Sequence, residues 1–130
     1  MVLALDTNCL LRWLLEDNEE QAAVVDEHLR SSKARLHVAD LAVVEAVWVL
    51  KKVYGFDDDL VVGLARKIIE HDKINCNRAL FGPVLAELNK SPKVSFVDIC
   101  LAYYADMGGA KLLTFDRTLA KRFPRMVKQA

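Results

Sequence analysis

The stretch Val2-Leu3-Ala4-Leu5-Asp6-Thr7-Asn8 near the start of the chain decides the fold. Four consecutive apolar residues lead directly into an acid, which is typical of a buried parallel strand that ends in a turn. Apolar residues return from residue 9, so a helix is expected to follow, with Asp6, Thr7 or Asn8 as its cap. Ligands bind at the carboxyl ends of strands in open α/β sheets, and Asp6 stands at such an end.

The rest of the chain alternates short apolar runs with amphipathic stretches. This pattern predicts further strands at about residues 35–38, 73–77, 111–116 and 125–127, and helices at about residues 10–15, 17–29, 41–54, 57–71, 77–89, 94–107 and 117–122. Asp40 is expected to be the N-cap of the third helix, and Pro83 to lie in the first turn of a later one. Strands that alternate with helices indicate an α/β fold with a parallel sheet. We expect one domain over residues 1–130, because neither a linker nor a repeat interrupts the chain.

The composition is that of a globular protein, since 53% of the 130 residues are hydrophobic. The formal net charge is zero, which by itself argues against a dedicated nucleic-acid-binding protein. No apolar stretch approaches the ~20 residues of a membrane span, and no basic segment of a secretory signal is present, so we expect a cytoplasmic protein without membrane contact. The three cysteines are far apart and form no CxxC motif, so we expect them to be small core residues: Cys9, Cys76 and Cys100.

Charge is unevenly distributed along the chain. Residues 1–30 contain seven acids and two bases, whereas residues 107–130 contain six bases and one acid, Asp116. A basic C-terminal end is suited to holding phosphates. The open alternative is a solvated face on a short last helix.

Four carboxylates interrupt the most apolar stretches of the sequence: Asp6, Glu45, Asp98 and Asp116. An ionised carboxylate that is buried without a partner is costly. Two carboxylates ~4 Å apart also repel by about 4 kcal/mol at an effective dielectric constant of ~20. A bound divalent cation removes both costs, and Mg²⁺ and Mn²⁺ prefer oxygen ligands. The pattern therefore predicts a metal site that suits phosphodiester hydrolysis.

Each acid also has a simpler interpretation. Asp6 and Asp116 are each suited to cap a helix, Asp98 to meet a helix dipole in a first turn, and Glu45 to lie on an exposed helix face. Three alternatives stay open beside a nuclease. One is another phosphate hydrolase with an acidic pocket, and the second is a catalytically idle binding module. The third is a purely structural role in which the acids are simply exposed.

The four acids stand in four motifs: Asp-Thr-Asn at residues 6–8, Glu45 within residues 41–50, Val97-Asp98-Ile99, and Thr-Phe-Asp-Arg at residues 114–117. Together these motifs resemble a PIN domain. Many relatives have a small residue where Ile99 stands. Within that family the chain looks most like a VapC-type toxin of prokaryotic toxin–antitoxin pairs, and the resemblance covers nearly the whole chain. It implies a three-layer α/β/α sandwich with a central parallel sheet of about five strands.

The resemblance also implies an activity and a set of roles. The activity is that of a magnesium- or manganese-dependent endoribonuclease, with an RNA substrate, a VapB-like antitoxin that covers the site, and a homodimer. The catalytic and metal-binding carboxylates would be Asp6, Glu45, Asp98 and Asp116, with Asn8 and Thr114 as hydrogen-bonding residues behind them. Charge position alone suggests three arginines as candidates for RNA contact: Arg12, Arg117 and Arg122.

Overall fold

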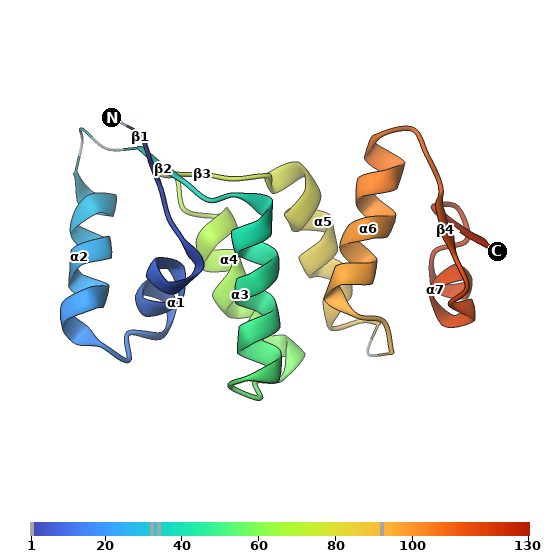
Figure 1. Ribbon diagram of the computed structural model, residues 1–130, viewed down its shortest axis with the longest axis horizontal. Helices are drawn as coiled ribbons and strands as arrows, with labels where there is room; N and C mark the ends of the chain where they lie inside the picture. The colour runs from blue at the N-terminus through green and yellow to red at the C-terminus, as the bar shows by residue number, and fades with distance from the viewer. Residues whose placement is uncertain (1, 32, 34, 92) are drawn as a thin grey trace. The chain divides into compact units, whose positions relative to one another are not determined.

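The computed structural model describes residues 2–31, 33, 35–91 and 93–130. The chain forms two compact units, Met1–Arg78 and Ala79–Ala130. Each unit contains its own parallel sheet and its own helices (Figure 1). The strands of the described residues form one sheet of three and one of two, and the predicted α/β class with parallel strands is confirmed.

In the first unit, strand β2 (Arg35–His37) lies between β1 (Val2–Ala4) and β3 (Ile74–Asn75). Both pairings are parallel, with Leu36 opposite Leu3 on one side and Ile74 on the other. Parallel neighbours need long crossovers, and pairs of helices supply them. The first crossover contains α1 (Thr7–Leu15) and α2 (Glu19–Arg30), and the second contains α3 (Asp40–Lys52) and α4 (Asp58–Ile69).

The second unit contains helices α5 (Arg78–Leu88), α6 (Phe96–Met107) and α7 (Arg117–Arg122), together with the parallel strands β4 (Leu112–Thr114) and β5 (Val127–Gln129). The first residue of α5 belongs to the first unit. Aromatic pairs contribute to the packing of the second unit. Phe81 and Phe96 stack with ring centroids 6.3 Å apart, and Tyr103 meets Phe123 edge-on at 5.9 Å. Such pairs add about 0.5–1.5 kcal/mol beyond the area that they bury.

The starts of α1 and α3 differ from the sequence-based prediction. Helix α1 begins at Thr7 rather than near residue 10, because Oδ1 of Asp6 accepts the Cys9 N–H at 2.8 Å and caps the helix there. The prediction of Asp40 as an N-cap is wrong. Ala39 is the N-cap of α3, and Asp40 is already helical, with its Oδ2 accepting a hydrogen bond from Nδ2 of Asn77 at 3.1 Å.

Two further expectations are corrected in the second unit. Pro83 lies in the sixth position of α5, which begins at Arg78, so it lies beyond the first turn of the helix and that prediction is wrong. The last strand begins at Val127 rather than at residue 125, because the N–H groups of Met126 and Val127 both donate to the Phe123 carbonyl in a turn.

None of the three cysteines forms a disulfide bond, and they differ in burial. Cys100 is buried, as expected of a small core residue, and Cys76 is partly buried. Cys9 is exposed beside Asp6, so the prediction that it is a core residue is wrong. Its apolar neighbours in the sequence face the core on the other side of α1, where Leu10, Leu11 and Leu14 are buried.

Candidate functional site

Asp6 is held at the carboxyl end of β1 by the helix that follows. Its Oδ1 accepts the Cys9 N–H at 2.8 Å and caps α1. This bond, with a smaller contribution from the backbone N–H of Asn8, holds the pKa of the Asp6 carboxyl below its ordinary value. The group is therefore ionised at neutral pH. Because a carboxylate has about four lone-pair sites, the capping bonds leave acceptor capacity for a cation.

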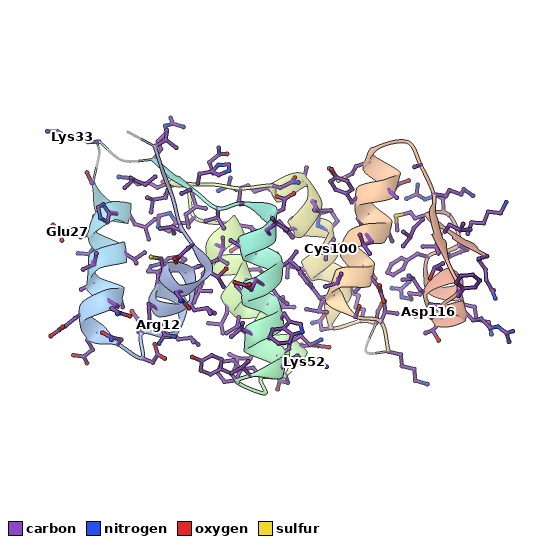
Figure 2. The ribbon with its side chains drawn as sticks, viewed as in Figure 1. Arg12, Glu27, Lys33, Lys52, Cys100 and Asp116 are labelled. Carbon is purple, nitrogen blue, oxygen red and sulfur yellow. The ribbon has the colours of Figure 1, made fainter. Side chains whose placement is uncertain are left out.

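Asp116 has the same local geometry at the end of β4 in the second unit. Its Oδ1 accepts the Leu119 N–H at 3.0 Å and caps α7, and Figure 2 shows it at the start of that helix. Oγ1 of Thr114 accepts the Asp116 N–H at 3.0 Å. The Thr114 hydroxyl thus holds the backbone of Asp116 in place, and with it the position of the Asp116 side chain.

Glu45 and Asp98 project from helices. Glu45 is exposed on α3, and two of the apolar residues a turn away are exposed too, Leu41 at 82% and Trp48 at 53%. Asp98 is partly buried in the first turn of α6, where its N–H donates to Oγ of Ser95, the N-cap, at 3.1 Å. Neither side-chain carboxylate forms a hydrogen bond or ion pair with any residue that the structure describes.

Each unit carries two of the four carboxylates, Asp6 and Glu45 in the first and Asp98 and Asp116 in the second. Within neither unit do three or more described His, Cys, Asp or Glu side chains gather to hold a metal ion. Asp6, Glu45 and Asp116 are exposed and Asp98 is partly buried. None of the four carboxylates is therefore buried deeply enough to have the full desolvation cost that the sequence analysis expected. The ion pairs among the described residues use other acids, including Asp17, Asp58, Glu87 and Asp106.

The three arginines proposed for RNA contact differ in their surroundings. Nη1 of Arg12 donates to both carboxylate oxygens of Asp17 at 2.7 Å, and a hydrogen bond with Tyr54 raises the pKa of its guanidinium. Arg122 donates to Ser91 and Glu87, and its guanidinium lies over the Phe123 ring.

Arg117 is exposed, and it forms no ion pair within the described part of the chain. The same is true of Lys111, Lys121 and Lys128. These four residues, which we call the basic end, carry the unpaired positive charge of residues 107–130. The second unit therefore has cationic groups that are available for phosphates.

A pocket of about 280 Å³, which we call the amide pocket, lies between α1 and α2 with Asp6 as one of its walls. Its other lining residues are Asn8, Cys9, Arg12, Gln21, Val24 and Val25. Partial desolvation, together with the neighbouring Asp6 carboxylate, raises the pKa of the Cys9 thiol, so the thiol stays protonated at neutral pH. Sequence reasoning missed Gln21. Its position on a helix that seemed merely acidic and solvated gave no signal.

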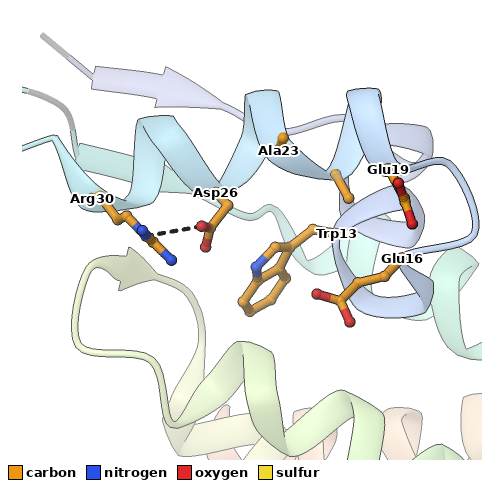
Figure 3. A pocket seen from close by; sticks show the side chains of 7 residues that line it. Trp13, Glu16, Glu19, Ala23, Asp26 and Arg30 are labelled. Carbon is orange, nitrogen blue, oxygen red and sulfur yellow. Dashed lines mark ion pairs between the residues drawn. The ribbon is translucent and has the colours of Figure 1, made fainter.

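A second pocket of about 530 Å³ lies on another part of the first unit (Figure 3). Three carboxylates line it beside Trp13, namely Glu16, Glu19 and Asp26, against the single base Arg30. Arg30 is already paired with Asp26 at 2.9 Å. The excess negative charge disfavours the phosphates of a nucleic acid here.

The fold and the acids define a class. This is an α/β protein of parallel strands in which ionisable carboxylates stand at strand ends, the usual place for ligands and catalysis. The sequence profile of the PIN domain family matches residues 3–124, which include parts of both units. The chain therefore belongs to the PIN domain family, whose members are generally metal-dependent nucleases.

No curated protein sequence matches the chain. Among the described residues, no helix has the length and apolar character needed to cross a membrane.

Proposed function

We propose that the chain is a magnesium- or manganese-dependent endoribonuclease and the toxin of a VapBC-type toxin–antitoxin pair. The observation that carries the proposal is the family match over residues 3–124. The residues support it, because all four predicted carboxylates are present and none is neutralised by a described lysine, arginine or histidine. The whole of residues 1–130 would act as one domain, because the family match covers parts of both units.

The donor set fits a hard divalent cation, because carboxylate oxygens are the ligands that Mg²⁺ and Mn²⁺ prefer. Asp6 and Asp98 would hold the metal directly, and Glu45 and Asp116 would complete the acidic site, directly or through water. When bound, the metal would neutralise phosphate charge and lower the pKa of a water molecule.

The supporting residues act on the geometry of these acids. The Asn8 backbone N–H and the Thr114 hydroxyl would keep the two strand-end aspartates oriented, as residues behind metal ligands commonly do. The basic end, and Arg117 within it, would hold the RNA backbone.

The decisive experiment compares purified wild-type protein with Asp6→Asn on total RNA, with Mg²⁺, with Mn²⁺ and with EDTA. We expect metal-dependent cleavage by the wild type only. Asp57→Asn is the matched control, because Asp57 is also an exposed N-cap, with Oδ1 accepting the Leu60 N–H at 2.9 Å. Cleavage by Asp6→Asn at the wild-type rate would contradict the site assignment.

Metal binding is measured separately from cleavage. The chain has two tryptophans, so a Trp13→Phe variant leaves Trp48, one turn from Glu45, as the single fluorescent reporter. We expect its emission to change on titration with Mn²⁺ and to respond less in a Glu45→Gln background. No response up to millimolar metal, together with no cleavage, would favour a catalytically idle binding module. Hydrolysis of a phosphomonoester in place of RNA would favour another phosphate hydrolase.

The toxin role and its partners are tested in cells and by sedimentation. Induced expression of the wild type should arrest growth, whereas Asp6→Asn should not. Co-expression of the product of an adjacent small upstream gene should restore growth and co-purify with the chain. Sedimentation should give the mass of a dimer. Normal growth with intact wild-type protein present would contradict the toxin assignment.

A further inference from the structure

The amide pocket contains two amide side chains that the proposed chemistry does not use. The Asn8 side chain forms no hydrogen bond with any described residue, and its contribution to Asp6 comes from the backbone N–H. Gln21 uses its backbone N–H to bond Oδ1 of Asn18 at 3.1 Å, which caps α2, while its side-chain amide has no partner among the described residues. Both amides line the pocket and are available to a ligand.

The other walls favour a flat, partly apolar ligand. Val24 and Val25 supply aliphatic surface from α2. The guanidinium of Arg12 is fixed by its two bonds to Asp17 at 2.7 Å, so its charge is largely compensated and its orientation is set. A fixed, compensated guanidinium is better suited to stack on a base than to capture a phosphate. The Asp6 carboxylate further disfavours an anion in the pocket.

A nucleobase matches these features, because it combines apolar faces with a hydrogen-bonding edge. The amides of Asn and Gln offer a donor and an acceptor side by side, the arrangement that pairs with base edges. The volume of about 280 Å³ lies just below the ~300–1,000 Å³ typical of pockets for drug-sized ligands. The space therefore suits one ring system rather than a larger molecule.

We infer that the amide pocket holds one nucleobase of the RNA substrate beside Asp6, and that Gln21 and Asn8 read its hydrogen-bonding edge. The inference rests on the proposed nuclease function, and it assigns the base preference of the cleavage site to α1 and α2. Gln21 is a specificity residue in this account. It contacts substrate without taking part in the metal site.

The first test measures binding without cleavage. Fluorescein-labelled ribotetranucleotides of A, C, G and U are titrated in EDTA, and affinity is read by fluorescence anisotropy. We expect the wild type to prefer one base. Gln21→Ala should reduce that preference by about 5- to 150-fold, the range for losing a good bidentate contact to a base. His28→Ala is the control, because His28 is exposed on the same helix and lines neither pocket.

A second variant keeps the inference falsifiable if the alanine variant is unstable. Gln21→Glu retains the acceptor and loses the donor, so relative affinity should shift away from uracil and toward the bases that present an exocyclic amino group, namely cytosine, adenine and guanine. Equal affinity of the wild type for all four oligonucleotides would overturn the inference. Equal losses for all four in Gln21→Ala, or unchanged ratios of affinity between the four bases in both variants, would also overturn it.

The cleavage arm separates this inference from the nuclease proposal. RNA substrates that differ at one nucleotide are cleaved with Mg²⁺ present, and kcat/KM is compared between the best and the worst base. Gln21→Ala should narrow that ratio by lowering kcat/KM for the substrate with the best base. If Gln21→Ala still cleaves RNA and its ratio of kcat/KM between the best and the worst base is unchanged, the base pocket is contradicted and the nuclease proposal stands. If the protein binds the bases selectively but cleaves no RNA, the nuclease proposal is contradicted and the base pocket stands.

Discussion

Replacing Asp6 by asparagine and by alanine separates its two roles, as a helix cap and as a metal ligand. The cap is a single bond from the Cys9 N–H to Oδ1 of Asp6, 2.8 Å long. Asparagine keeps an equivalent acceptor and is about as good an N-cap as aspartate, whereas alanine loses the bond and costs about 1 kcal/mol. For 130 residues, an unfolding entropy of ~2.1 cal/mol/K per residue converts 1 kcal/mol into a fall of about 4 °C in Tm.

The assay pairs calorimetry with RNA cleavage in Mg²⁺. We expect Asp6→Asn to keep the wild-type Tm within about 1 °C and to lose cleavage, and Asp6→Ala to lose both cleavage and about 4 °C. Only a role for the negative charge explains an asparagine variant that is stable and inactive. If Asp6→Asn cleaves RNA normally while Asp6→Ala is destabilised and weak, then Asp6 is a cap and the metal assignment fails.

The pH dependence of the same variants supplies an independent check. The folded-state pKa of Asp6 is held below its ordinary value of 3.8 by the Cys9 and Asn8 N–H groups. A depressed carboxyl pKa stabilises the fold above the unfolded-state pKa, and that stabilisation is lost as the pH falls through the folded-state value. The difference in unfolding free energy between wild type and Asp6→Asn should therefore be constant from about pH 7 to 5. Below about pH 4 the wild type should lose stability relative to Asp6→Asn. A change in this difference centred near neutral pH would show that the Asp6 carboxyl is not its cause.

Three further predictions concern packing and local chemistry. Arg78→Ala should lower the free energy of unfolding by about 2–3 kcal/mol in urea titrations, because its guanidinium donates to the carbonyls of residues 69, 71 and 74; the exposed Arg35→Ala is the control, and equal effects would refute the reasoning. Phe81→Ala should cost about 3–5 kcal/mol, since a fully buried stacked ring is lost; a cost below 1 kcal/mol would show that the ring is not packed as described. Iodoacetamide should modify Cys9 faster in Asp6→Asn than in wild type at pH 8, measured by mass spectrometry, because the Asp6 carboxylate contributes to the raised pKa of that thiol; an unchanged rate would contradict the contact.

The strand ends are where sequence reasoning worked best. The apolar run into Asp6, and its counterpart into Asp116, predicted two strands and two helix caps, and both caps are present. These features depend on a few neighbouring residues, so local sequence contains the information that fixes them.

Features that depend on distant residues were harder to predict. The exposure of Glu45 follows from which face of α3 packs on the core, and its apolar neighbours Leu41 and Trp48 disguised that face. The amide pocket needs α2 to lie against α1, so Gln21 could not be recognised from its own neighbours. The convergence of the four carboxylates involves residues far apart in the chain and stays a prediction.

The shared geometry of Asp6 and Asp116 has a consequence for side-chain freedom. Each carboxylate accepts a hydrogen bond from the first turn of its helix, and this bond restricts the side chain, so less torsional entropy is left to lose when a ligand arrives. A glutamate at either position would have an extra methylene and a third rotatable bond, and it would lose the short bridge to the helix amide. Replacing either aspartate by glutamate, although it keeps the negative charge, would thus be among the least tolerated substitutions.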